Sequence, residues 1–76
     1  MDKQKRTEIG RRAANAIMRR AGDENTTLSR QFNLIDTHYQ YLYRWMRGGM
    51  PGADVLANMA ESGYDIHYIL TGREAS

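Results

Sequence analysis

Glycine and proline divide the second half of the chain into short segments, and this division restricts the possible folds more than any other feature. Gly48 and Gly49 end one segment, Pro51 and Gly52 open the next, and further glycines follow at positions 63 and 72. Glycine readily adopts the left-handed conformation that closes helices, and proline suits the start of a helix. Residues 44–72 therefore predict the end of one helix, a loop, an amphipathic helix and a short final helix.

The length and composition indicate one small domain without covalent or metal cross-links. Seventy-six residues lie near the lower limit for a chain that buries a self-sufficient core. The chain has no cysteine, and neither His38 nor His67 has further ligands at a metal-binding spacing, so we expect no metal and no cofactor. The apolar runs are too short to cross a bilayer, and the charged N-terminus leads into no apolar run, so we expect a soluble protein inside the cell without membrane contact.

Positive charge is concentrated in the first part of the chain. Residues 1–47 carry ten Lys/Arg and five Asp/Glu, whereas residues 48–76 carry one arginine and four acidic residues. The two parts thus have balances of +5 and −3, which together make the net charge of +2. This asymmetry favours a protein that presents one face to a polyanion such as DNA. The alternative is a solvated helix face formed by Arg11, Arg12, Arg19 and Arg20.

The spacing of apolar residues predicts five short helices and no strand, which makes an all-α domain, a compact helical bundle. We expect the first helix to begin near Thr7 and to end at Gly22. The second helix is expected to begin at Asn25 or Thr26, with Asn33 after it in the left-handed conformation. The predicted buried residues of these two helices are Ile9, Ala13, Ala16, Ile17, Leu28, Ser29 and Phe32.

The remaining three helices are bounded by caps and glycines. We expect Asp36 or Thr37 to cap the third helix, which then runs to residue 46 or 47. The fourth helix is expected within residues 51–63, and the fifth is expected to begin after Asp65 and to end at Gly72. The predicted buried residues are Leu34, Ile35, Tyr39, Leu42, Trp45, Met46, Val55, Leu56, Met59, Ala60, Ile66, Ile69 and Leu70.

Three features of this order resemble the DNA-binding domain of lambda-type phage repressors. They are the segment RWMRGG at residues 44–49, Pro51 shortly after it, and the closing segment YILTG at residues 68–72. The resemblance implies a helix-turn-helix, in which the third helix lies in the major groove of DNA. Ser29, Phe32 and Asn33 stand where the family has a small residue, an apolar residue and a glycine. The spacing from there to Trp45 is about three residues longer than in the family pattern, so the start of the third helix stays open by three positions.

The resemblance also implies a domain organisation and a function. Residues 1–6 would form a basic N-terminal arm, residues 7–72 the helix-turn-helix domain, and residues 73–76 a tail or the start of a linker. Domains of this kind bind double-stranded operator DNA and regulate transcription as repressors of a phage or prophage. We therefore expect a weak homodimer that binds palindromic half-sites in the cytoplasm and nucleoid of a bacterial host, with no small-molecule substrate.

The third predicted helix supplies the candidate base-reading residues. With Leu42 and Trp45 facing the core, the opposite face of the helix is free to meet a DNA groove. Glutamine can form two hydrogen bonds with adenine, and arginine can form two with guanine. The candidate base readers are Tyr39, Gln40, Tyr43 and Arg44. The alternative for the two tyrosines is that they only pad an amphipathic helix.

Candidate phosphate contacts need positive charge or hydrogen-bond donors and little angular precision. These candidates are Lys3, Lys5, Arg6, Thr26, Thr27, Arg30 and Arg47. The resemblance implies that the last helix contributes to the dimer, and the candidate dimer contacts are Ile66, Ile69 and Leu70. The alternatives are that the basic arm is a tail without a role, and that the apolar residues of the last helix belong to the core of their own domain.

The sequence contains no recognisable catalytic grouping. It has no Ser/His/Asp set, no glycine-rich phosphate loop and no paired carboxylates on one helix face, so we do not expect an enzyme. Two alternatives to the repressor domain stay open. One is a short Cro-like or excisionase-type regulator that is complete in itself. The other is a small helical protein-interaction module, such as an antitoxin or an antirepressor.

Overall fold

The computed structural model describes residues 2–74, and this part of the chain contains helices and no strand. The expected all-α fold with five helices is confirmed for these residues. The helices are α1 (Lys3–Asp23), α2 (Leu28–Leu34), α3 (Tyr41–Met46), α4 (Ala53–Glu61) and α5 (Ile66–Thr71). The prediction that all five are short is wrong for α1, which has 21 residues. Of the predicted C-terminal tail at residues 73–76, the last two residues lie outside the described range.

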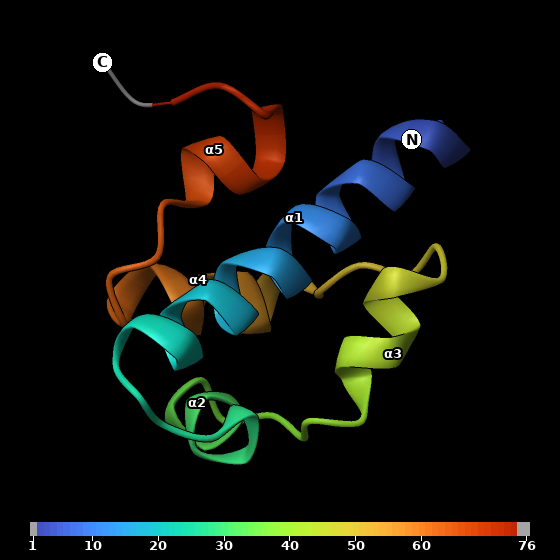
Figure 1. The fold of residues 1–76 in the computed structure, drawn as a ribbon. Coiled ribbons are helices and arrows are strands. Elements are labelled where there is room, and N and C mark those ends of the chain that lie inside the picture. The colour runs from blue at the N-terminus through green and yellow to red at the C-terminus, as the bar shows by residue number, and fades with distance from the viewer. Residues whose placement is uncertain (1, 75–76) are drawn as a thin grey trace.

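Helix α1 is the central element of the molecule. It crosses the middle of the fold, and the other four helices lie around it (Figure 1). Helices α2, α3 and α5 pack directly against α1, and α4 packs against α5. A helix of this length spans roughly 30 Å, which is close to the longest dimension of the molecule, 33 Å. One long helix therefore supplies the surface on which the short ones assemble.

The core is built on the small side chains of α1 and on a few large ones from the other helices. The buried residues of α1 include Gly10, Ala13 and Ala14, which allow α3 to approach closely. Trp45 of α3 is 2% exposed, and its ring lies 5.4 Å from the ring of Phe32 in α2. The prediction that Trp45 is buried is confirmed, as it is for Ile9, Ala13, Ile17, Phe32, Ile35, Leu42, Met59 and Ile69.

The N-terminus of α1 differs from the prediction. The helix begins at Lys3, because the Asp2 carboxylate accepts a hydrogen bond of 2.8 Å from the backbone N–H of Gln4. This cap precedes Thr7, which lies inside the helix and donates its hydroxyl to the Lys3 carbonyl. The predicted start at Thr7 and the predicted arm at residues 1–6 are therefore wrong for residues 2–6. Lys3, Lys5 and Arg6 lie on the first turns of a regular helix.

The connections on either side of α2 also differ from the prediction. Gly22 lies inside α1, and the left-handed residue that follows the helix is Asn25, with φ 51°. Helix α2 is capped by the Thr27 hydroxyl, which accepts the backbone N–H of Arg30, so the predicted start at position 25 or 26 is wrong. After α2 the left-handed residue is Asp36, with φ 56°, rather than position 33. In each case a polar residue one to three positions further along the chain takes the predicted place.

Helix α3 begins later than predicted. Residues 38–40 form a turn in which the Tyr41 N–H donates to the His38 carbonyl, and the His38 Nδ1 accepts the N–H of Gln40. The regular helix then starts at Tyr41, so capping by residue 36 or 37 is wrong. This also resolves the three-residue ambiguity in the start of the third helix. Residues 35–40 connect α2 and α3.

Six residues that were predicted to be buried are exposed in the structure. Tyr39 lies in the turn before α3, and the other five lie at the margin of the apolar stripe of their helix, where a small rotation of the backbone decides between core and solvent. Tyr39 and Met46 are both 44% exposed, and Leu34 is 61% exposed. The other three are Ser29, Ala60 and Leu70. In α2 the inner position next to Phe32 is occupied by Gln31 instead.

The boundaries of α4 and α5 agree with the prediction. Gly52 precedes α4, the Asp65 carboxylate caps α5 through the N–H of Tyr68, and Gly72 ends α5 with φ 77°. Pro51 is fully buried, which secures the loop between α3 and α4. In this half of the chain the glycines and the proline stand close to the helix ends.

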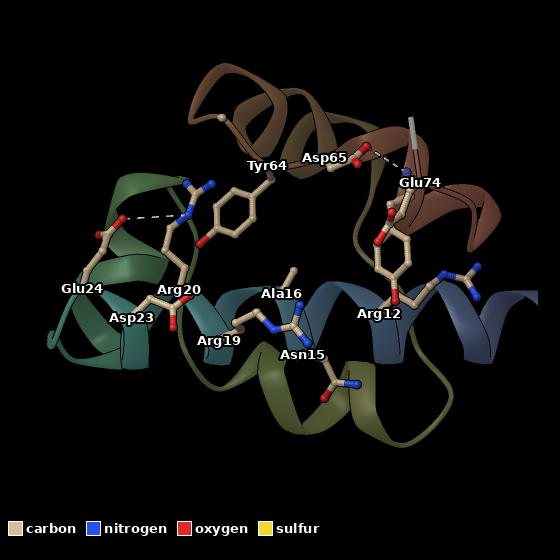
Figure 2. A pocket seen from close by; sticks show the side chains of 12 residues that line it. Arg12, Asn15, Ala16, Arg19, Arg20, Asp23, Glu24, Tyr64, Asp65 and Glu74 are labelled. Atoms are coloured by element: carbon tan, nitrogen blue, oxygen red, sulfur yellow. Dashed lines mark hydrogen bonds and ion pairs between the residues drawn. The ribbon is translucent and has the colours of Figure 1, made fainter. Parts of the chain in front are cut away.

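Two arginines of α1 bind the C-terminal ends of the last two helices. Arg12 donates from Nε to the Ile69 carbonyl at 2.8 Å, and Arg20 donates from Nη1 to the Ser62 carbonyl at 2.6 Å. Arg20 also lies over the ring of Tyr64, 3.7 Å from its centroid, and Figure 2 shows the two side chains together. These carbonyls lack partners within their own helices. The alternative that these arginines only form a solvated helix face is therefore wrong for Arg12 and Arg20.

Candidate nucleic-acid interface

The exposed face of α3 carries most of the candidate base-reading residues. Leu42 and Trp45 anchor the helix in the core, and the opposite face presents Gln40, Tyr43 and Arg44 to solvent. Tyr43 is 59% exposed, so its ring and hydroxyl are both accessible. Because helical side chains repeat every 3.6 residues, fixing the two anchors also fixes which residues face outward. Polar donors and acceptors thus stand together on one accessible surface.

Tyr39 lies in the turn before α3 and is exposed as well. Its ring stacks on that of His38, with the ring centroids 4.7 Å apart. The same histidine holds the N–H of Gln40 through its Nδ1 atom. The structure therefore brings all four predicted base readers to the surface at α3 and its preceding turn. None of them belongs to the core, which leaves their polar groups available to a ligand.

The candidate phosphate contacts on α2 and α3 are accessible to different degrees. Arg30 on α2 and Arg47 at the end of α3 are exposed. Thr27 is exposed, and its side-chain oxygen accepts the hydrogen bond that caps α2. Because a hydroxyl can donate and accept at the same time, Thr27 can also donate a hydrogen bond to a phosphate. Thr26 is partly buried and lies before the helix. Arg47 lies directly after α3, Arg30 lies on α2, and the two threonines precede α2 at the end opposite the turn to α3.

The basic residues of the N-terminus lie near the end of α3. Thr7 in α1 faces Gly48, where a side-chain carbon would lie 3.7 Å from its hydroxyl. The first turns of α1, with the exposed Lys3, Lys5 and Arg6, are therefore on the same side of the molecule as the loop after α3. Since these residues are helical, they present charge from a fixed position and do not form a wrapping arm.

The candidate dimer contacts on α5 separate into two groups. Ile69 is 1% exposed and belongs to the core, so its assignment as a dimer contact is wrong. It is buried because it faces α1, where Arg12 also holds its carbonyl. Ile66 is partly buried, whereas Leu70 is 39% exposed. Tyr68, which was not among the candidate contacts, is 38% exposed and lines the pocket between α1 and α5.

A groove between α1 and α5 carries polar groups that sequence reasoning missed (Figure 2). At one end, the Tyr64 hydroxyl donates to Gln31 at 3.1 Å, and the Gln31 amide donates to Glu24 at 3.0 Å. Burial raises the pKa of the Tyr64 hydroxyl above its ordinary value, and the charge of Arg20 opposes this rise. The one indication of this buried polar cluster in the sequence is Gln31, a polar residue directly before the buried Phe32. Its partners come from distant segments, which a local pattern does not indicate.

Comparison with known proteins assigns no relatives to this chain. No family model matches it, and neither a curated protein nor a solved structure matches it. Among residues 2–74, no helix combines the length and the apolar character needed to cross a membrane.

Proposed function

We propose that this protein binds duplex DNA in a sequence-specific way through α3, as a transcriptional repressor domain of phage or prophage type. The observation that carries the proposal is the exposed face of α3. There Gln40 and Arg44 present the side-chain groups that pair with adenine and guanine, while Leu42 and Trp45 anchor the opposite face. A helix held in this way keeps its side chains at defined positions, as base reading requires.

Helices α2 and α3, with the turn between them, are proposed to act as the helix-turn-helix. The contact between the rings of Phe32 and Trp45 supports a defined relation between the two helices. Ile35, which is fully buried, secures the turn from below. Arg30 on α2 and Arg47 at the end of α3 would contact phosphates on either side of the groove.

The proposed binding species is a homodimer on palindromic half-sites. Two recognition helices about 34 Å apart can occupy successive major grooves on one face of DNA. Leu70 on α5 is an exposed apolar residue and is the proposed dimer contact. The domain would regulate transcription by occupying its operator, without catalysis.

A selection of bound sequences from random duplex DNA tests this proposal. The selected duplex is then titrated with the protein by fluorescence anisotropy at increasing salt concentration. If four to six phosphates are neutralised, log affinity should fall against log salt with a slope of about −4 to −5. Failure to enrich any sequence, or a flat dependence on salt, overturns the proposal.

A second candidate function is a protein-interaction module. The observation that favours it is the number of exposed aromatic and apolar side chains on and around α3, including Tyr39, Tyr41, Tyr43 and Met46. Aromatic residues and methionine are enriched at protein interfaces. An apolar protein interface responds weakly to salt, so the same titration separates the two functions.

A further inference from the structure

Arg44 is held from one side by an aromatic ring. Its guanidinium carbon lies 5.4 Å from the centroid of the Tyr41 ring. The two residues are three positions apart on α3, a spacing that places their side chains next to each other on the helix surface. A cation at this distance from the ring is attracted by the negative face of the π system. Tyr41 therefore restricts the orientation of the Arg44 side chain.

Gly49 bounds the stem of Arg44 from another direction. A side-chain carbon at Gly49 would lie 2.8 Å from Cγ of Arg44, so the backbone of the loop runs directly against this stem. The loop is itself held in place, because the Gly49 N–H donates to the Arg44 carbonyl at 2.9 Å. It is also packed against Gly10 of α1, where there is no room for a methyl group. The stem thus meets a fixed surface.

The head group of Arg44 has no such constraint. Arg12 and Arg20 donate to backbone carbonyls at the ends of helices, whereas the Arg44 guanidinium forms no hydrogen bond or ion pair with residues 2–74. An arginine has five N–H donors in a planar arrangement. In Arg44 the stem is confined while the donors stay available. This combination suits a group that must meet a ligand in one orientation.

We infer that Tyr41 and Gly49 are positioning residues that preset Arg44 for bidentate pairing with a guanine. The inference rests on the proposed function and adds the part of the site that determines specificity at one base pair. Confining the side chain before binding reduces the conformational entropy that is lost when the two hydrogen bonds form. Tyr41 would act through Arg44 and without touching the base.

The test uses single-base variants of the duplex selected by the wild-type protein. Affinities are measured for wild type, Tyr41→Leu, Tyr41→Phe, Arg44→Ala and the double variant Tyr41→Leu/Arg44→Ala. Arg44→Ala should remove the preference for guanine at one position. Tyr41→Leu should weaken the same preference by about two- to five-fold, the range expected for an exposed cation–π contact. Tyr41→Phe keeps the ring and should keep the preference.

The double variant separates positioning from direct contact. If Tyr41 acts through Arg44, adding Tyr41→Leu to Arg44→Ala should cause no further loss. A loss that persists in the Arg44→Ala background, or one shared by Tyr41→Phe, overturns the inference, because Tyr41 then touches DNA itself. Since Tyr41 is 43% exposed, its replacement should leave the fold intact, and thermal melting of each variant checks this.

The inference and the proposed function fail in different ways. If Arg44→Ala removes a guanine preference and Tyr41→Leu leaves it unchanged, then positioning by Tyr41 is refuted and DNA reading by α3 stands. If the protein selects no sequence at all, the proposed function fails and the inference fails with it. An equal loss at every base pair in Tyr41→Leu also contradicts positioning, because it indicates a phosphate contact.

Discussion

Gly10 of α1 and Gly49 of the loop after α3 approach each other so closely that a methyl group does not fit between them. A side-chain carbon at Gly10 would overlap the Gly49 carbonyl oxygen and lie 2.7 Å from the Trp45 carbonyl oxygen. Both obstacles are backbone atoms, which cannot turn aside as a flexible side chain can. This contact sets the separation between α1 and the end of α3, and with it the position of the proposed reading helix.

Gly10→Ala should therefore destabilise the protein, in spite of the higher helix propensity of alanine. We expect a loss of about 1–3 kcal/mol in the free energy of unfolding, as for other overpacked core positions. Gly22→Ala is the matched control, because it is also inside α1 and a side-chain carbon there meets no atom within 4 Å. That variant should gain about 0.5–1 kcal/mol. Urea unfolding measures both, and equal effects would contradict the close contact.

Trp45→Ala should remove most of the stability of the domain. Trp45 is 2% exposed and packs against Phe32, and replacing a buried tryptophan by alanine costs about 3–5 kcal/mol. Small domains have about 5–15 kcal/mol in total. Tyr43→Ala is the control on the same helix, because Tyr43 is 59% exposed, and it should change stability by about 0.5 kcal/mol at most. Circular dichroism measures the thermal melting midpoint of each variant. An unchanged midpoint in Trp45→Ala would contradict the burial of Trp45.

The Tyr64 hydroxyl should make stability depend on pH in the alkaline range. Folding raises its pKa above the ordinary value of 10.0, mainly through burial, so the folded state holds this proton more tightly than the unfolded state. The contribution of this group to the free energy of unfolding is fully present below the unfolded-state pKa of 10.0, and it is lost as the pH rises through the higher pKa of the folded state. Tyr64→Phe lacks the group and should lose less stability on going from about pH 8 to pH 11.

Tyr64→Phe should also be less stable than wild type at neutral pH. The substitution leaves the buried Gln31 oxygen without its donor, which costs about 1–3 kcal/mol. Urea titrations of both proteins across the pH range give the difference directly, and other titrating groups cancel in that difference. Stability curves that run parallel to each other would contradict a raised pKa.

Arg44→Ala and Arg30→Ala should weaken DNA binding in different ways if α3 reads bases. Arg44→Ala should lose about 1–3 kcal/mol of discrimination at one base pair. Arg30→Ala should weaken all sequences alike and reduce the salt slope by about one, because phosphate contacts carry no direct sequence information. Anisotropy titrations on operator variants distinguish the two. Uniform weakening by Arg44→Ala would place that arginine on a phosphate.

Leu70→Glu should reduce self-association without unfolding the domain. Leu70 is 39% exposed, so a charge there meets solvent in the monomer and is buried only in the proposed dimer. Sedimentation with and without a palindromic operator should show a dimer for wild type and a weaker one for the variant. A wild-type protein that stays monomeric and occupies single half-sites would contradict the dimer.

The second half of the chain was predicted most closely from sequence. Between residues 48 and 72 the glycines, Pro51 and the Asp65 cap stand close to the observed helix ends. These signals work because they act through the local backbone, by permitting a left-handed residue or satisfying a free N–H group. The anchors Leu42 and Trp45 were also identified, since a spacing of three positions places both side chains on one face of a helix.

The ends of the first three helices and the polar groups inside the fold were decided by the tertiary structure. The sequence offers several polar residues that could cap α1 and α2, and in the structure Asp2 and Thr27 are the caps. Arg12 binds a carbonyl 57 residues away and Arg20 one 42 residues away. By itself the sequence determined that helices would form and that central side chains such as Phe32, Leu42 and Trp45 would be buried, because both depend on local periodicity. Leu34, Met46 and Leu70 were predicted to be buried as well, and the packing of the helices left them exposed. Only the packing around α1 decided which arginines support the fold and which stay free, because that choice depends on groups brought together from distant parts of the chain.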